Sequence, residues 1–168
     1  VLKPGSLVEQ RFSALLDLQV DSESVYCSGA FPTLASQVVQ LRELLDSSGH
    51  ASIDDQDSNI LRVLIDTHDR FQELNNQPDQ KFFLLHPGSS GIHRADVAFA
   101  GMAVHWSRQA RLERVPNWTR NPDLFLDQPW FLDGGEQGSL LRALSVARGV
   151  PALRARGIFL ASTNLESI

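Results

Sequence analysis

The chain has 168 residues, of which 42% are hydrophobic and 21% are charged, and its net charge is −5. These values exclude a disordered tail and a fibrous repeat, and they predict one soluble globular domain over residues 1–168 with its own core. The charge is unevenly distributed, because residues 1–80 hold 13 acidic and 5 basic side chains while residues 81–168 hold 7 and 10. This asymmetry fits either attraction between two halves of one domain or an anion-facing surface in the second half.

The cysteine content and the hydropathy pattern predict where the protein works. Cys27 is the only cysteine, so an internal disulfide is excluded and no oxidising compartment is required. No run of about 18 apolar residues is present, and the N-terminal residues lack the basic-then-apolar order of a secretory signal. We therefore expect a cytoplasmic protein without a membrane partner.

Apolar residues recur at helical spacing in several stretches of the chain. Ser6 and Glu9 have the form of a capping box before the first stretch, and Gly49 is placed to end the second. The polar residues 46–59 are expected to form a loop that caps the next helix. The helices predicted from these patterns are residues 6–17, 34–45, about 59–74, about 92–114 and about 136–148.

Three short apolar runs, near 24–28, 82–86 and 157–161, are expected to be strands. The run Lys81–His86 is apolar on both faces, as an interior strand is. Residues 117–133 combine prolines with two apolar bursts and predict an extended segment or a loose hairpin. Because strands and helices alternate, we expect a single α/β domain in which about five helices pack on a small, at least partly parallel sheet.

The stretch Lys81–Arg114 joins an apolar run, a Gly/Ser turn and a long amphipathic segment. A strand that passes through such a turn into a helix exposes amide donors and the positive end of the helix dipole, which together bind phosphate or carboxylate. The pattern is neither a dinucleotide fingerprint nor a P-loop, so no nucleotide is implied. The residues predicted to bind an anion are Gly88, Ser89, Ser90 and Gly91.

His86, His93 and Asp96 form a second candidate site beside this turn. Two imidazoles and a carboxylate can hold a divalent metal with an open position for water, which would make these residues the catalytic centre of a small hydrolase. In the competing interpretation, His93 and Asp96 only cap the start of the helix. Convergence of the three side chains within about 5 Å would separate the two interpretations.

The second half of the chain interleaves arginine with tryptophan, a combination typical of hot spots in protein interfaces. The leading prediction is therefore a non-catalytic binding or regulatory domain that acts through a protein partner. The alternative is the small metal-dependent or phosphate-recognising hydrolase. The third prediction is nucleic-acid binding by the arginine-rich second half of the chain, in which Arg120, Arg142, Arg148, Arg154 and Arg156 would also take part. The acidic pI of about 5.4 counts against nucleic acid. The predicted partner-binding residues are Arg108, Arg111, Arg114, Trp118 and Trp130.

Overall fold

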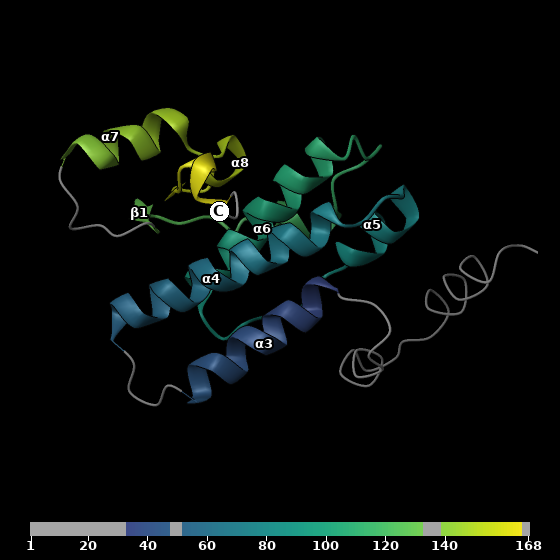
Figure 1. Ribbon diagram of the computed structural model, residues 1–168, viewed down its shortest axis with the longest axis horizontal. Coiled ribbons are helices and arrows are strands. Elements are labelled where there is room, and N and C mark those ends of the chain that lie inside the picture. The colour runs from purple at the N-terminus through teal and green to yellow at the C-terminus, as the bar shows by residue number, and fades with distance from the viewer. Residues whose placement is uncertain (1–32, 48–51, 133–138, 166–168) are drawn as a thin grey trace, which may run out of the picture. The chain divides into compact units, whose positions relative to one another are not determined.

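The computed structural model describes residues 33–47, 52–132 and 139–165, all within the compact unit Pro32–Ile168. The described part is mostly helical, with six α-helices and one two-stranded parallel sheet (Figure 1). The expected combination of helices with a small parallel sheet is thus present in the described residues, but the sheet has only two short strands and helices make up most of the structure. The elements in chain order are α3 (Leu34–Ser47), α4 (Ile53–Gln72), α5 (Gln77–Phe83), α6 (His93–Gln109), the 3₁₀ helix η1 (Asn117–Arg120), β1 (Trp130–Phe131), α7 (Ser139–Arg148), α8 (Pro151–Arg154), β2 (Ile158–Phe159) and the 3₁₀ helix η2 (Ser162–Leu165).

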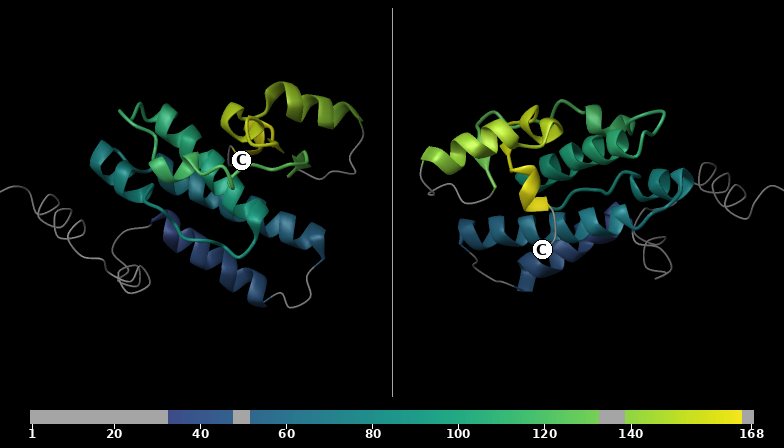
Figure 2. Two further views of the ribbon diagram at one scale, coloured as in Figure 1. Left: turned by 180° about the vertical axis from the view of Figure 1, so that it is seen from behind. Right: turned by 45° about the horizontal axis from the view of Figure 1, so that its top comes forward.

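Helix α6 is the centre of the hydrophobic core. It packs against α4 and α8, while α3 packs along α4 (Figures 1 and 2). Small residues on α6 allow this close packing on several sides: a Cβ atom at Gly101 would lie 2.6 Å from Leu153 Cδ2 of α8. The prediction of a long helix in this region is therefore confirmed, but burial is not confined to one face, because residues 97–103 are all buried. The buried residues of α6 are Ala95, Val97, Ala98, Phe99, Ala100, Gly101, Met102, Ala103, Trp106 and Ser107.

Helix α4 begins at Ile53, six residues earlier than the sequence pattern predicted. Ser52 caps it: its Oγ accepts a hydrogen bond from the Asp55 amide at 3.2 Å, and Asp55 Oδ2 accepts one from the Ser52 amide at 3.1 Å. This reciprocal pair satisfies two amide donors that a helix start leaves open. Residues 53–58, expected to be a loop, are helical, and Asp54 and Asp55 lie at the positive end of the helix dipole.

The strand predicted at residues 82–86 is wrong, because Phe82 and Phe83 belong to helix α5. Asn76 caps this helix, its side chain accepting from the Asp79 amide at 2.9 Å, and a proline follows in the first turn. An asparagine cap followed by a proline in the first turn is a typical helix start. The strand predicted near 24–28 and the helix predicted at 6–17 lie outside the described residues.

The two strands of the sheet are parallel, with Trp130 opposite Ile158 and Phe131 opposite Phe159. The chain passes from β1 to β2 through α7 and α8, because parallel strands need a crossover connection. The rings of Phe131 and Phe159 stack with centroids 4.9 Å apart. The strand expected near 157–161 and the parallel pairing are confirmed, and the extended segment 117–133 supplies the partner strand.

Helix α6 ends at Gln109 and not near Arg114, because the chain reverses in a Schellman motif. Arg111 has φ 52°, its amide donates to Arg108 O at 3.1 Å, and the Leu112 amide donates to Ser107 O at 2.9 Å. Glycine usually holds this left-handed position. The turn carries the chain towards η1.

Candidate functional site

The three predicted metal ligands each contact a different partner. Gly88 N donates to His86 Nδ1 at 3.0 Å, and His93 Nε2–H donates to Asp123 O at 2.6 Å. Asp96 instead accepts hydrogen bonds from Ser89 and Ser90 of the preceding turn. Among the residues that the structure describes, no group of three or more His, Cys, Asp or Glu side chains is arranged to hold a metal ion. The structure therefore does not bring His86, His93 and Asp96 together.

The Gly/Ser turn at residues 88–91 surrounds a carboxylate of the protein itself. Asp96 accepts hydrogen bonds from Ser90 N and from Ser89 Oγ, both at 2.6 Å, and the Gly91 amide donates to Ser89 Oγ at 3.1 Å. The Arg42 guanidinium closes the turn by donating to Ser89 O. An open cavity of about 540 Å³ adjoins the turn, but its lining contains the acidic Asp46 as well as Arg42. Much of the donor set predicted for an external anion is thus already used.

The two tryptophans predicted to bind a partner hold elements of the fold together. Trp130 is 8% exposed, and its Nε1 donates to Asp57 Oδ2 at 2.9 Å while the Arg94 guanidinium lies 5.0 Å from its ring centroid. Trp118 is half-buried and donates from Nε1 to Leu84 O at 3.0 Å. The predicted arginines Arg108, Arg111 and Arg114 are exposed.

A second cavity, of about 430 Å³, gathers arginines from three parts of the fold. Arg108 comes from α6, Arg120 from η1, and Arg156 from the turn between α8 and β2. Apolar residues form the rest of the wall, among them Phe125, which is 43% exposed. We call this cavity the arginine pocket; its complete lining is Val104, Arg108, Val115, Thr119, Arg120, Phe125, Ala152, Ala155 and Arg156.

Arg156 is the buried floor of the arginine pocket, with 6% of its surface exposed. Its guanidinium donates to Leu124 O at 2.6 Å and to Thr119 O at 2.5 Å, and its Cζ lies 4.5 Å from the Phe125 ring centroid. Burial lowers the pKa of Arg156, but an arginine remains charged at neutral pH. Its positive charge is therefore held in place by carbonyl groups and an aromatic ring.

No carboxylate of the described residues forms an ion pair with Arg108, Arg120 or Arg156. The lining of the pocket also contains no acidic side chain. The arginines of the lining are therefore not neutralised by an acidic side chain of the described residues.

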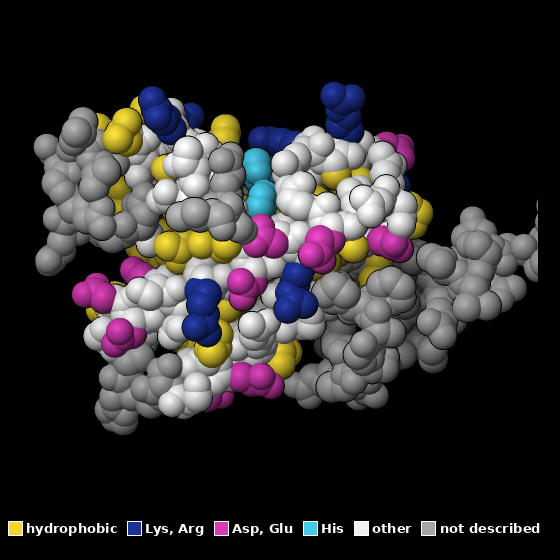
Figure 3. All heavy atoms as spheres, in the orientation of Figure 1, with side chains coloured by type: hydrophobic (Ala, Val, Ile, Leu, Met, Phe, Trp, Pro, Cys, Tyr) yellow, Lys and Arg dark blue, Asp and Glu magenta, His cyan; other side chains and the backbone are white. Residues whose placement is uncertain are grey.

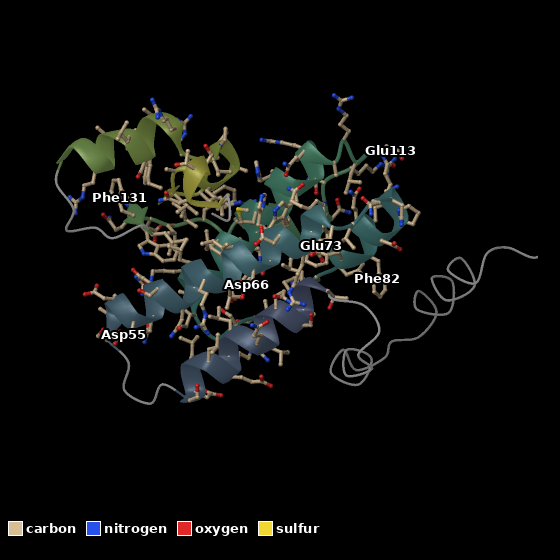
Figure 4. The ribbon with its side chains drawn as sticks, viewed as in Figure 1. Asp55, Asp66, Glu73, Phe82, Glu113 and Phe131 are labelled. Atoms are coloured by element: carbon tan, nitrogen blue, oxygen red, sulfur yellow. The ribbon has the colours of Figure 1, made fainter. Side chains whose placement is uncertain are left out.

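Acidic side chains predominate elsewhere, along helix α4. Figure 3 shows Asp and Glu side chains over this helix, and Figure 4 shows Asp55 and Asp66 on it and Glu73 at its C-terminal cap. The charge asymmetry of the sequence therefore has a structural counterpart. Acidic groups follow α4, whereas α6, η1 and the turn after α8 contribute the arginines of the pocket.

The sequence named Arg108 for partner binding and left Arg120 and Arg156 among the other arginines of the second half, so it did not connect the three. Phe125 is 43% exposed and its side chain lines the open pocket. No local pattern identifies the set, since its members lie on elements separated by up to 48 positions in the chain. The packing of both η1 and α8 on α6 brings them together.

Comparisons with protein-family models, with curated proteins and with solved structures give no match to this chain. None of the helices in the described part is both long and apolar enough to cross a membrane. The function therefore has to be inferred from the arginine pocket and its chemistry.

Proposed function

We propose that this is a non-catalytic binding domain that acts through a protein partner, and that the arginine pocket is its contact surface. The observation that supports the proposal is the lining of the pocket, which contains three arginines and an exposed phenylalanine but no acidic side chain. Arginine and aromatic side chains in a partly desolvated pocket are the usual anchors of protein interfaces. Charge complementarity makes the contacting part of the partner acidic.

The chemistry of the pocket favours binding over catalysis. A nucleophile needs a general base within hydrogen-bond reach, and the lining contains no His, Cys, Asp, Glu, Lys or Ser. Its one hydroxyl, on Thr119, donates to Pro116 O at 2.8 Å. The hydrolase alternative at residues 86–96 lacks a gathered ligand set. We place the protein in the cytoplasm because a single cysteine requires no oxidising compartment.

Nucleic acid is a weaker candidate for the same surface. Strand binding uses an extended basic groove with aromatic platforms for successive bases. The arginine pocket is a single cavity of about 430 Å³, a size suited to one or two side chains. The proposal therefore stays with a protein partner.

The test uses the full chain as bait and compares it with the double variant R108E/R120E. Both positions are exposed, so the variant should fold. A partner captured by the wild type is to be identified, purified and titrated against both proteins by isothermal calorimetry. We expect the double variant to bind at least about tenfold more weakly, corresponding to about 1.4 kcal/mol.

The matched control is R62E/R148E, which reverses two exposed arginines on α4 and α7 that do not line the pocket. It should bind the purified partner with nearly the wild-type affinity. Equal weakening by the two double variants would show a general charge effect and refute the pocket as the contact surface. Failure of every captured protein to bind in purified form would refute the protein-partner proposal.

A further inference from the structure

The polar part of the arginine pocket has unused donor capacity. A guanidinium carries five N–H donors, and Arg156 has recorded acceptors for two of its nitrogens, Leu124 O and Thr119 O. No hydrogen bond or ion pair within the described residues engages the side chains of Arg108 and Arg120. A carboxylate in the pocket would therefore meet several donors, and charge-assisted bonds of this kind are the stronger ones.

The apolar part of the pocket is equally defined. The ring of Phe125 is partly exposed and partly covered by the Arg156 guanidinium. Valine and alanine side chains from α6, α8 and the segments that follow them complete the wall. A small inorganic anion would leave these surfaces exposed to water. A ligand that also carries an apolar group would bury them and gain in proportion to the area removed from water.

Arg156 is held rigidly, which favours recognition of a fixed geometry. A Cβ atom at Gly101 would lie 3.3 Å from Arg156 Cδ, so the stem of the arginine runs close along α6. Its guanidinium is bound to two carbonyl groups from different segments. A ligand would not have to immobilise this side chain on binding, and such preorganisation lowers the cost of association.

From these observations we infer that the arginine pocket recognises an acidic residue standing next to a bulky apolar residue in the partner protein. The carboxylate lies against Arg108, Arg120 and the free donors of Arg156, and the apolar side chain lies on Phe125. This inference rests on the proposed function, because it names the part of the partner that enters the pocket.

The first experiment measures how tightly small molecules bind to the polar part and to the apolar part of the arginine pocket. Phenylacetate, its neutral analogue phenylacetamide and inorganic phosphate are titrated into isotope-labelled protein and followed by amide chemical shifts. Phenylacetate is expected to bind with a dissociation constant of about a millimolar, as its size allows, and to shift the amides of residues 119–125 and 156. Phenylacetamide should bind about fivefold more weakly, since it offers no charge-assisted bond.

Variants assign the binding to the named residues. R108Q/R120Q should weaken phenylacetate binding by about fivefold or more, whereas R62Q/R148Q should leave it unchanged. Arg156 is also structural, so R156K, which keeps the charge, is assessed only after its amide spectrum shows a native fold. The inference is overturned if phenylacetate and phenylacetamide bind equally or if phosphate binds as tightly as phenylacetate. It is also overturned if R108Q/R120Q binds phenylacetate no more weakly than R62Q/R148Q does.

The second experiment places the same chemistry in a peptide. A peptide containing Glu-Phe should compete with phenylacetate, and the matched Gln-Phe peptide should compete several-fold less well. If neither phenylacetate nor the Glu-Phe peptide binds while a purified partner does, the ligand class is wrong and the proposed function stands. If phenylacetate binds but no protein partner is found, the pocket serves a free carboxylate and the proposed function fails.

Discussion

The substitution W106F probes the most densely packed point of the core. Trp106 is completely buried, its ring stacks on Phe71 with centroids 5.5 Å apart, and it meets Phe83 edge-on at 6.2 Å. Its indole Nε1 donates to His68 Nδ1 at 2.9 Å. Phenylalanine keeps an aromatic ring in place but removes the second ring of the indole and the hydrogen-bond donor.

Two losses add up in the free energy of unfolding. Removing part of a fully buried ring from a closed core costs about 1–2 kcal/mol through lost transfer and the cavity left behind. Losing the donor leaves His68 Nδ1 without this partner, which costs about 1 kcal/mol more. We therefore expect the variant to be destabilised by about 2–3 kcal/mol.

The assay is urea unfolding at neutral pH, followed by far-ultraviolet circular dichroism, with the slope of the transition compared to confirm two-state behaviour. The matched control is W118F: this tryptophan also donates from Nε1, to Leu84 O at 3.0 Å, but it is only half-buried. The control should lose clearly less stability. A loss below about 1 kcal/mol in W106F, or an equal loss in the two variants, would refute the assignment of α6 as the core centre.

Three further predictions follow from single contacts. Burial first, then the charges of His68 and Arg108, lower the pKa of His105 from its usual 6.5, so the folded state binds fewer protons than the unfolded one. This contribution to stability is present above pH 6.5 and is lost as the pH falls through the lowered pKa. The urea midpoint of the wild type should therefore drop on acidification, and that of H105Q should drop less. Equal dependence of the two midpoints on pH would contradict this prediction. R111G should raise the free energy of unfolding by about 0.5–1 kcal/mol, because glycine adopts the left-handed conformation of Arg111 without strain, while R111V should lower it. A lower free energy of unfolding for R111G in the same urea assay would show that the backbone at this position is not strained. D96A should cost about 1–3 kcal/mol and speed amide exchange at Ser90, whereas D123A should not; unchanged exchange would show that Asp96 does not organise the turn.

Several differences between expectation and structure have local physical causes. The capping pair Ser52 and Asp55 was readable in the sequence, but the polar residues around it favoured a loop. The run at residues 81–86 is too short for periodicity to separate a strand from a helix, and tertiary packing buries Phe83 and Leu84 in helical geometry. Arg111 ends α6 in a conformation that the sequence signals only when glycine is present.

The sequence alone determined the positions of the long helices and of the strand near residue 158, because each depends on a local pattern of apolar side chains. It did not determine the partner of that strand, Trp130–Phe131. Of the residues that it named for partner binding, Arg108 lines the pocket. The tertiary structure decided that Asp96 fills the turn at 88–91 and that Arg156 becomes the buried floor of a pocket. Such a site depends on how α8 packs against Gly101 of α6, a contact between distant positions that no local pattern encodes.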